Sequence, residues 1–328
     1  MSFLVLKEHE IVQLLPMAEC IEVVAGAFAA LDSGEMTQPL RSVFVPPDAN
    51  GLMAWMPAHH AGAAPVFGMK VLCLVPSNPS RGLDAHQGLV LVSDGETGQL
   101  RALLDASPIT AIRTAAVSAL ATRLLARADS STLAIVGTGV QALGHLESIP
   151  LVRPIERVRI AGRTPERARE FVATLAGRYP FAIEASPSAE AAVRDADIVV
   201  TATNTREPVL RREWLSPGTH VNGVGASQRT HQELDTQTVA DSALFTDRRE
   251  SLENEAAEYR LALEESLIAP SHLRGELGEL VTGKIAGRTS DTELTLFRSL
   301  GLAAFDVAAA EHVVAKAHRD GAGLTVDF

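Results

Sequence analysis

The sequence predicts an α/β protein in which a Rossmann-type, doubly wound parallel sheet is joined to a second α+β domain. From residue 132 to 298, short apolar strands alternate with helical segments, the pattern of a parallel sheet covered by helices. The first of these strands runs directly into a Gly-x-Gly-x-x-Ala turn at residues 137–142. Before residue 106, by contrast, one helix is followed by strands separated by Pro, Gly and Asn, which is typical of a meander.

The first domain begins with helical periodicity. Apolar side chains recur at helical spacing over residues 10–32 and predict one amphipathic helix there. Strands are predicted at residues 42–45, 52–56, 66–75, 88–93 and 100–105. Ser107 as N-cap and Pro108 as the first helical residue start a helix that ends near residue 126, roughly 28 Å away at 1.5 Å per residue. A helix of this length can bridge two domains.

The second domain alternates strand and helix from Thr132 onward. Further strands are predicted at residues 158–161, near 183, and at 198–202, 220–225, 243–246 and 294–297. Helices are predicted at residues 165–178 and 189–194, the first opened by Thr164 and Pro165. A terminal helix follows at residues 303–318, and the pattern alone assigns it to this domain.

The Gly-x-Gly-x-x-Ala turn is where a dinucleotide pyrophosphate would bind. Gly137 allows the tight turn, Gly139 lets the backbone approach the phosphates, and Ala142 is small enough for the helix to pack on the strand. The helix N-terminus then directs free N–H groups at the anion. Such a turn by itself also occurs as a plain strand–turn–helix, but the alternating units after it favour a cofactor site.

The next strand indicates which dinucleotide is bound. An NAD site usually ends this strand in an acid that bonds the ribose 2′-hydroxyl, and here the strand ends in Gly162-Arg163-Thr164, with Arg167 one turn further on. Guanidinium and hydroxyl groups suit a 2′-phosphate, so NADPH (NADP) is preferred over NADH. The alternative is that both arginines are solvated cations, although cations are poorly placed at the positive end of a helix dipole.

The composition fits a globular enzyme of two domains. The chain has 328 residues, of which 46% are hydrophobic and 21% charged. The net charge of −11 argues against nucleic acid as a partner. Cys20 and Cys73 have no metal-ligand spacing and are interpreted as buried thiols, so no metal site is expected. Neither a signal peptide nor a membrane-spanning run is recognised, and we expect a cytoplasmic protein with no membrane partner.

Three cations interrupt otherwise apolar segments of the first domain. Lys70 stands in a strand that is apolar on both faces, where an unpaired ammonium is costly and needs an anion. Arg113 lies early in the bridging helix, and Arg41 opens a strand. Taken singly, each is also explained by a snorkelling or salt-bridged side chain.

The chain resembles the ornithine cyclodeaminase/mu-crystallin family over nearly its whole length, and is closer to the mu-crystallin (ketimine reductase) branch. The motifs that carry the resemblance are Phe-Gly-Met-Lys-Val around Lys70, Ala-His-Gln-Gly around His86, Ile-Thr-Ala-Ile-Arg-Thr-Ala-Ala-Val-Ser-Ala around Arg113, Val-Gly-Thr-Gly-Val-Gln-Ala at the turn, Val-Asn-Gly-Val-Gly-Ala-Ser before Glu233-Leu234-Asp235, and Phe297-Arg298-Ser299-Leu300-Gly301. The resemblance implies a substrate-binding and homodimerisation domain, residues 1–120 with 300–328, that includes the C-terminal helix. It also implies an inserted Rossmann domain, residues 121–299.

The resemblance also implies the site residues. A substrate carboxylate would be clamped by Arg41, Lys70 and Arg113, with His86 and Ser227 as lesser candidates for moving a proton. The residues implied at the cofactor are Thr114, Gly137, Thr138, Gly139, Val140, Gln141, Arg163, Thr164, Arg167, Thr201, Ala202, Thr203, Val224 and Ser299.

One position departs from the cyclodeaminase branch. That branch has an aspartate after the glycines of the late strand, where this chain has Ser227. A serine is neither a carboxylate base nor a counter-ion for a substrate ammonium, so ornithine cyclisation is disfavoured. Ser227 could instead merely close a turn by hydrogen-bonding the backbone, and His86 could order a turn or a cofactor phosphate. His59 and His60 are interpreted as part of a solvated loop.

The expected function is NADPH-dependent reduction of a ketimine with an α-carboxylate, such as 1-pyrroline-2-carboxylate or 1-piperideine-2-carboxylate. Three alternatives stay open: an amino-acid dehydrogenase of the alanine or arginine type, an ornithine cyclodeaminase, and a non-catalytic small-ligand binder that retains NADPH. The expected partners are a small imino or amino acid and a second copy of the chain.

Overall fold

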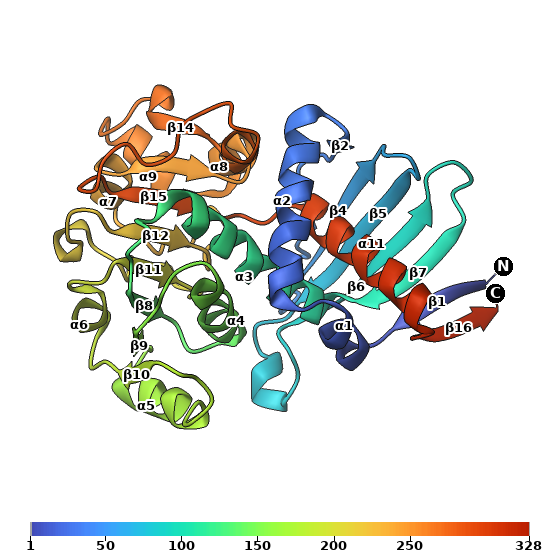
Figure 1. The fold of residues 1–328 in the computed structure, drawn as a ribbon, viewed down its shortest axis with the longest axis horizontal. Helices are drawn as coiled ribbons and strands as arrows, with labels where there is room; N and C mark the ends of the chain where they lie inside the picture. Colours follow the sequence, from blue (N-terminus) through green and yellow to red (C-terminus); the bar gives the residue numbers. More distant parts are fainter. Residues whose placement is uncertain (1, 328) are drawn as a thin grey trace. The chain divides into compact units, whose positions relative to one another are not determined.

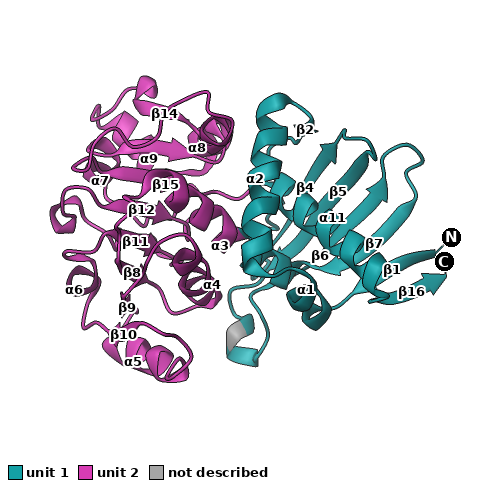
Figure 2. Cartoon of the chain, viewed as in Figure 1, with its two compact units in different colours: residues 1–113, 302–328 teal, residues 114–301 magenta. Residues whose placement is uncertain are grey.

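The computed structural model describes residues 2–327, except the side chain of Pro79, and divides the chain into two units (Figure 2). Unit 1 consists of the residues up to 113 together with those from 302 onward, and unit 2 consists of residues 114–301. The outermost residues of the first predicted domain, Met1 and Phe328, lie outside the described residues. Each unit is built on its own eight-stranded sheet.

The sheet of unit 1 is an antiparallel meander with its two chain ends paired at one edge. Its order is β16-β1-β7-β6-β5-β4-β2, and β3 also pairs with β4. β1 runs parallel to β7 and antiparallel to β16. The sequence did not predict β1 or β16. The bounds are β1 Ser2–Leu6, β2 Met36–Thr37, β3 Ser42–Phe44, β4 Leu52–His60, β5 Val66–Leu74, β6 His86–Asp94, β7 Leu100–Asp105 and β16 Leu324–Asp327.

The predicted helix over residues 10–32 is two helices in the structure, so that prediction is wrong. α1 spans Glu8–Leu14 and α2 spans Met17–Ser33, bent by 81° at the break. Pro16 is the cause, because it lacks an N–H and disfavours helical conformation at the residue before it. No single helix within residues 2–327 is long and apolar enough to cross a membrane, and α1 and α2 pass that test only as a bent pair.

The helices of unit 1 cover one face of its sheet. α11, Ala303–Asp320, lies across strands β4 to β6, and α2 packs beside α11 (Figure 1). The rings of Phe28 and Phe305 meet at 4.5 Å between centroids, and Val307 packs where a side chain on Gly68 would collide at 2.4 Å. Gly68 therefore lets α11 approach β5 closely.

The other face of this sheet is apolar and exposed. Strand alternation places on it Phe44, Met53, Trp55, Phe67, Cys73 and Leu89, which we call the outer face. The expectation of two buried thiols is therefore wrong for Cys73, although Cys20 is buried. His59 and His60 lie in β4 rather than in a loop, and the Nδ1 of His60 lies 3.1 Å from a carboxylate oxygen of Glu311.

Unit 2 confirms the predicted Rossmann-type sheet. All its strands run parallel in the order β10-β9-β8-β11-β12-β15-β13-β14. Their bounds are β8 Thr132–Val136, β9 Arg157–Ala161, β10 Ala182–Ala185, β11 Ile198–Thr201, β12 His220–Gly223, β13 Ala243–Thr246, β14 Leu273–Glu276 and β15 Thr295–Arg298. The helices are α4 Val140–Ser148, α5 Pro165–Thr174, α6 Ala189–Val193, α7 Thr236–Ala240, α8 Arg249–Glu255, α9 Ala257–Glu264 and α10 Leu277–Val281.

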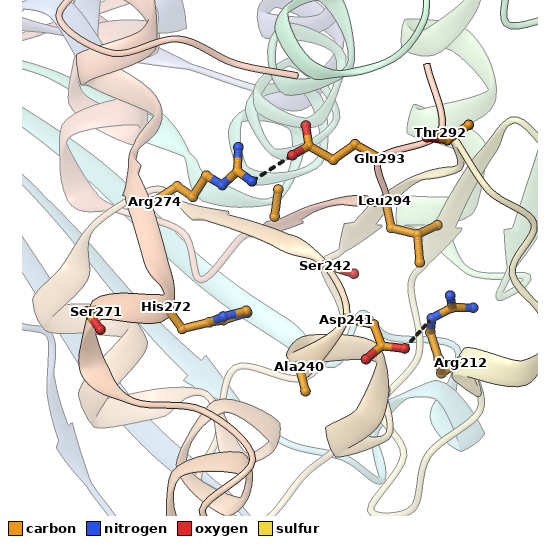
Figure 3. A pocket seen from close by; sticks show the side chains of 11 residues that line it. Arg212, Ala240, Asp241, Ser242, Ser271, His272, Arg274, Thr292, Glu293 and Leu294 are labelled. Atoms are coloured by element: carbon orange, nitrogen blue, oxygen red, sulfur yellow. Dashed lines mark ion pairs between the residues drawn. The ribbon is translucent and has the colours of Figure 1, made fainter. Parts of the chain in front are cut away.

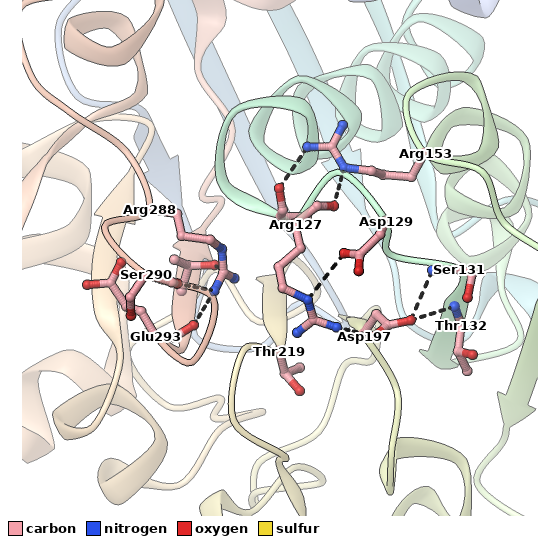
Figure 4. A network of polar contacts seen from close by, with 12 residues as sticks. Arg127, Asp129, Ser131, Thr132, Arg153, Asp197, Thr219, Arg288, Ser290 and Glu293 are labelled. Carbon is pink, nitrogen blue, oxygen red and sulfur yellow. Dashed lines mark hydrogen bonds and ion pairs between the residues drawn. The ribbon is translucent and has the colours of Figure 1, made fainter.

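Helix α3, Ala106–Leu125, begins in unit 1 and ends in unit 2. The carboxylate of Asp105, rather than Ser107, caps its start by accepting from the Ser107 N–H at 2.9 Å. Two arginines cap its last turn (Figure 4): Arg153 donates to the carbonyls of Arg123 and Ala126, and Arg288 donates to that of Leu125. These cations satisfy carbonyls that have no partner within the helix and complement the helix dipole.

The contacts of α3 explain where the two units divide. Arg113 bonds to Asp306 of α11, whereas Ser118 and Thr122 bond to His145 and Asn222 of unit 2. The division therefore falls at 113/114 and 301/302, and the sequence placed it at 120/121 and 299/300.

Candidate active site

A buried cluster of opposite charges lies in unit 1. Lys70 stands in the middle of β5, between Met56 of β4 and Val90 of β6, and is 2% exposed. Its Nζ lies 2.8 Å from Oδ2 of Asp306 on α11, and the Nε of Arg113 on α3 donates to Oδ1 of the same carboxylate at 2.9 Å. We call these three residues the Lys70 cluster. The structure thus supplies the anion that the sequence required for Lys70.

The cluster carries more positive than negative charge. Burial lowers the pKa of Lys70 to about 8; the carboxylate of Asp306 opposes this shift, and the charges of Arg113 and Arg41 add to it. The influence of Arg41 places it near the ammonium, ahead of β3. Two buried cations share one carboxylate, which leaves an excess of positive charge in a site that water scarcely reaches and favours binding of an anion.

His86 lies near the same cluster. It is the first residue of β6, and its side chain is exposed in unit 1. Its pKa is lowered by partial desolvation and by the charge of Lys70. His86 therefore favours the neutral imidazole, and its role in moving a proton stays a prediction.

The turn after β8 has the geometry that a dinucleotide requires. Gly137 has a φ of +143°, and a Cβ on it would lie 2.6 Å from the carbonyl oxygen of Ala202. Gly139 is the N-cap of α4, and a Cβ there would meet nothing within 4 Å. No side chain caps this helix start. The N–H groups of its first turn therefore have no capping side chain and are available to a bound pyrophosphate.

Other residues of the turn also fit a cofactor. Val140 is 64% exposed although it is apolar, and the side-chain oxygen of Gln141 is buried without a hydrogen bond from any described residue. Thr114 is buried in α3. These features are consistent with a ligand that covers Val140 and supplies a donor to Gln141.

The residues after β9 lie where an adenosine phosphate is expected. Thr164 caps α5 by accepting from the backbone N–H of Arg167, and Arg163 and Arg167 are both exposed. Arg169, two residues on, pairs with Glu166 at 2.6 Å. Arg163 and Arg167 form no ion pair with a residue in 2–327, so their guanidinium groups are open to a ligand.

A buried carboxylate holds the ends of β11 and β12. Glu233 accepts from the hydroxyl of Thr201 at 3.0 Å and from the N–H and hydroxyl of Thr203 at 2.6 and 2.7 Å. It also accepts from the N–H groups of Gly225 at 2.6 Å and Ala226 at 3.3 Å. The Thr201 and Thr203 hydroxyls thus donate to Glu233. Their oxygens can still accept a hydrogen bond, and the placement of residues 201–203 at the cofactor stays a prediction.

A buried arginine also contacts the loop that follows β12. Arg298 pairs with Glu258 and donates to the carbonyls of Gly223, Ala226 and Ser299. Ser299 is buried, and its N–H donates to Gly223 at 2.9 Å. Val224 and Ser227 therefore lie in a loop whose backbone is fixed at both ends by buried charges. Ser227 itself is half-buried there.

The hollow of about 530 Å³ in unit 2 lies elsewhere (Figure 3). It opens at the amino ends of β13, β14 and β15, whereas the dinucleotide turn follows the carboxyl end of β8. Its charges are paired with each other, Arg212 with Asp241 and Arg274 with Glu293. We do not assign the candidate site to this hollow.

Asp306 and Glu233 are functional candidates that the sequence reasoning missed. Asp306 is flanked by Ala304, Phe305, Val307 and Ala308, and an acid in such an apolar stretch is the same signal that singled out Lys70. Glu233 belongs to one of the motifs that carry the family resemblance, but no role is predicted for it from the sequence. Nothing in the sequence indicates that its carboxylate reaches back to Thr201 and Thr203.

Comparison with known proteins agrees with this geometry. The sequence is 34% identical to a Delta(1)-pyrroline-2-carboxylate reductase of Bacillus cereus over 99% of this chain and 100% of that protein. It is 34% identical to the ketimine reductase mu-crystallin of Mus musculus over 89% of both chains.

Two solved structures are also similar over the whole chain. One is the Delta(1)-pyrroline-2-carboxylate reductase of Thermococcus litoralis in complex with NADH and L-proline, with a TM-score of 0.95, 36% identity, and coverage of 99% of this chain and 100% of that one. The other is an archaeal alanine dehydrogenase dimer with bound NAD, with a TM-score of 0.93, 32% identity and full coverage of both chains.

Fold, turn and cationic cluster together define a two-domain oxidoreductase that uses a nicotinamide cofactor. The family model for the ornithine cyclodeaminase/mu-crystallin family matches residues 1–321, and the chain belongs to that family. The resemblance drawn from the motifs is confirmed.

Proposed function

We propose that this protein is an NADPH-dependent reductase of cyclic ketimines that carry an α-carboxylate, such as 1-pyrroline-2-carboxylate or 1-piperideine-2-carboxylate. The observation that carries the proposal is the Lys70 cluster, in which one carboxylate is shared by two buried cations with Arg41 nearby. The family relatives that act on pyrroline-2-carboxylate and on ketimines support it.

The charges of the cluster favour a substrate with one carboxylate. Lys70 and Arg113 bring two positive charges and Asp306 brings one negative charge, and the charge of Arg41 acts on Lys70 from nearby. A substrate carboxylate neutralises part of the excess and leaves room for positive charge to develop on the imine nitrogen. Arg113 uses its Nε for Asp306, and the donors on its two terminal nitrogens suit a carboxylate in forked geometry.

Each residue of the cluster then has a role in the reduction. Arg113 and Arg41 orient the carboxylate, and with it the adjacent C=N bond. Lys70 gives a proton to the imine nitrogen; a pKa of about 8 lets it act as an acid near neutral pH. A bound nicotinamide dinucleotide supplies the hydride for the imine carbon. The product is a cyclic amino acid of the proline or pipecolate type.

The preference for NADPH is supported by the start of α5. Arg163 and Arg167 are exposed beside Thr164, and no acid ends β9. A ribose 2′-phosphate accepts charge-assisted hydrogen bonds from such arginines. Ser227 supports reduction over cyclodeamination, since it offers no carboxylate to a substrate ammonium.

A panel assay tests the function. Purified protein is mixed with NADPH or NADH and with cyclic imino acids or with keto acids plus ammonia, and the product is identified by mass. We expect NADPH oxidation with a cyclic imino acid. Turnover only with ammonia and a keto acid would indicate an amino-acid dehydrogenase. Ammonia release from ornithine without net NADPH consumption would indicate a cyclodeaminase, and tight NADPH binding without turnover a ligand-binding protein.

We also propose that the outer face of unit 1 pairs two copies of the chain. Phe44, Met53, Trp55, Phe67 and Leu89 are all exposed on this one face, and exposed apolar side chains gathered in one patch are typical of an interaction surface. The archaeal relative described as a dimer supports a second copy as the occupant. Light scattering of wild type and of a Trp55→Asp, Phe67→Asp double variant tests this, and we expect a dimer and a monomer respectively. A monomeric wild type would refute the proposal.

A further inference from the structure

We propose that Asp306 is a positioning residue for the reduction: it holds Lys70 as an ammonium and fixes the guanidinium of Arg113, and thereby sets the alkaline limit of the reaction. This inference rests on the proposed function, because it assigns Lys70 as the proton donor.

The geometry of Asp306 shows that it serves both cations at once. Its two oxygens are divided between them, Oδ2 to Lys70 at 2.8 Å and Oδ1 to Arg113 at 2.9 Å, and the carboxylate is fully buried. Asp306 lies in the first turn of α11, where the helix dipole stabilises an anion. Gly68 allows α11 to lie close to β5, so Asp306 can reach the middle of the strand.

The groups around Lys70 leave Asp306 as its counter-ion. Arg113 of α3 and Arg41 ahead of β3 are positively charged and disfavour the charged form of Lys70. His86 of β6 has a lowered pKa and favours its neutral form. Cys20 of α2 is near Arg113 and Asp306, and burial raises the pKa of its thiol to about 12, so it remains uncharged. The facing residues of β4 and β6, Met56 and Val90, are apolar. Among these groups only Asp306 is an anion.

The transfer of electrons and protons in the reduction shows why the charge of Lys70 matters. The imine carbon gains a C–H bond from the hydride of the reduced dinucleotide, and the electron pair of the C=N bond moves to nitrogen. Nitrogen gains an N–H bond from the Lys70 ammonium, which is left as a neutral amine and takes a new proton from water. Without Asp306, two neighbouring guanidinium groups would drive Lys70 toward the neutral amine, which has no acidic proton of use at neutral pH.

The test is the pH dependence of Asp306→Asn. The kcat/KM of wild type and variant is measured from pH 6 to 10 with a cyclic imino acid and NADPH. The rate falls as the pH rises through the pKa of Lys70; removing the carboxylate lowers that pKa, so we expect this fall to occur at least one pH unit lower in the variant. We also expect kcat to drop at least tenfold at pH 7.5. A merely structural carboxylate would lower the rate equally at all pH values. If the fall in kcat/KM at high pH, the alkaline limb of the profile, occurred at the same pH in variant and wild type, the proposal would be overturned.

Two further variants keep the test decisive. Asp306→Glu retains the charge, and we expect its alkaline limb close to that of wild type even where kcat is reduced; this variant also serves if Asp306→Asn does not fold. Glu311→Gln removes an acid from the same helix that pairs with His60 instead, and we expect it to leave the limb unmoved. A limb moved equally by Glu311→Gln would contradict a specific role for Asp306.

The failure of the proposed function can be told apart from failure of this inference. The titration of the Lys70 side chain is followed by carbon-13 NMR of protein labelled on lysine, without any substrate, and the signal is assigned with Lys70→Arg. A lower midpoint in Asp306→Asn supports the inference even if no imine is reduced. An equal midpoint in both proteins refutes it even if imines are reduced.

Discussion

The carboxylate of Glu233 accepts hydrogen bonds from both the backbone N–H and the hydroxyl of Thr203, at 2.6 and 2.7 Å. Because the same carboxylate also accepts from Gly225 and Ala226, one side chain sets the spacing between the ends of β11 and β12. Backbone N–H groups can only donate, so this position requires an acceptor on both oxygens.

Glu233→Gln places an amide NH₂ against these donors. We expect the loop to open and the affinities for NADPH and NADH to fall alike, by about tenfold or about 1.4 kcal/mol. Fluorescence titration of the reduced cofactors measures this. Asp235→Asn is the control: Asp235 caps α7, so its loss should lower the melting temperature without changing cofactor affinity. Unchanged affinity in Glu233→Gln would exclude this role.

Replacing Arg163 and Arg167 together by Ala should separate the two cofactors. Two charge-assisted hydrogen bonds to a 2′-phosphate are worth about 3 kcal/mol, so we expect the Kd for NADPH to rise by about 100-fold while that for NADH changes little. Isothermal titration calorimetry gives both constants. Arg169→Ala, a change on the same helix to an arginine already paired with Glu166, should affect neither. Equal loss for both cofactors would contradict a 2′-phosphate site.

The two glycines of the turn should respond differently to Ala. Gly137 has a positive φ and a carbonyl 2.6 Å from where a Cβ would lie, so Gly137→Ala should cost about 2–4 kcal/mol of folding free energy. Gly139 has open space, and Gly139→Ala should cost less than about 1 kcal/mol yet still weaken cofactor binding. Urea unfolding and cofactor titration measure the two effects. Cofactor affinity in Gly139→Ala equal to wild type would show that the open space is not used.

His145 should make the protein less stable in acid. Burial lowers its pKa to about 4, and its Nδ1 donates to the carbonyl of Gln141 while Nε2 accepts from Ser118. The folded pKa lies below the unfolded value of 6.5, so the unfolded chain binds more protons as the pH falls from 6.5 to 4. This costs on the order of 3 kcal/mol of stability.

The pH dependence of urea unfolding in His145→Gln checks this prediction. The variant loses the hydrogen bonds at every pH but should lose less additional stability than wild type between pH 7 and pH 4.5. His9→Gln, at an exposed position of α1, should follow wild type. Parallel curves for His145→Gln and wild type would show that His145 is not the group that titrates.

The sequence predicted helices and strands well where the local pattern of apolar and breaking residues is strong. β7 at residues 100–105 and β13 at residues 243–246 have the predicted bounds, because apolar runs there are flanked by clear breaks. Pro16 was overlooked because the apolar spacing continues through it. β16 is exposed and short, and only pairing with β1, more than 300 residues earlier in the chain, makes it a strand.

The candidate site was predictable where chemistry conflicts with its surroundings. Lys70 in an apolar strand and Gly137 in a tight turn can both be recognised from the residues next to them in the sequence. The pairing of Lys70 and Arg113 with Asp306 depends on how α11 packs on β5, and sequence spacing contains no such information. For the same reason sequence spacing does not show that Glu233 accepts hydrogen bonds from the hydroxyls of Thr201 and Thr203.

The placement of Asp306 on α11 also affects how the protein is made. Unit 2 is one continuous stretch, residues 114–301, so it can fold as it leaves the ribosome. Unit 1 is encoded on both sides of it, and Lys70 and Arg113 are translated long before their shared carboxylate. During synthesis the Lys70 cluster can therefore be completed only after the whole of unit 2 has been translated.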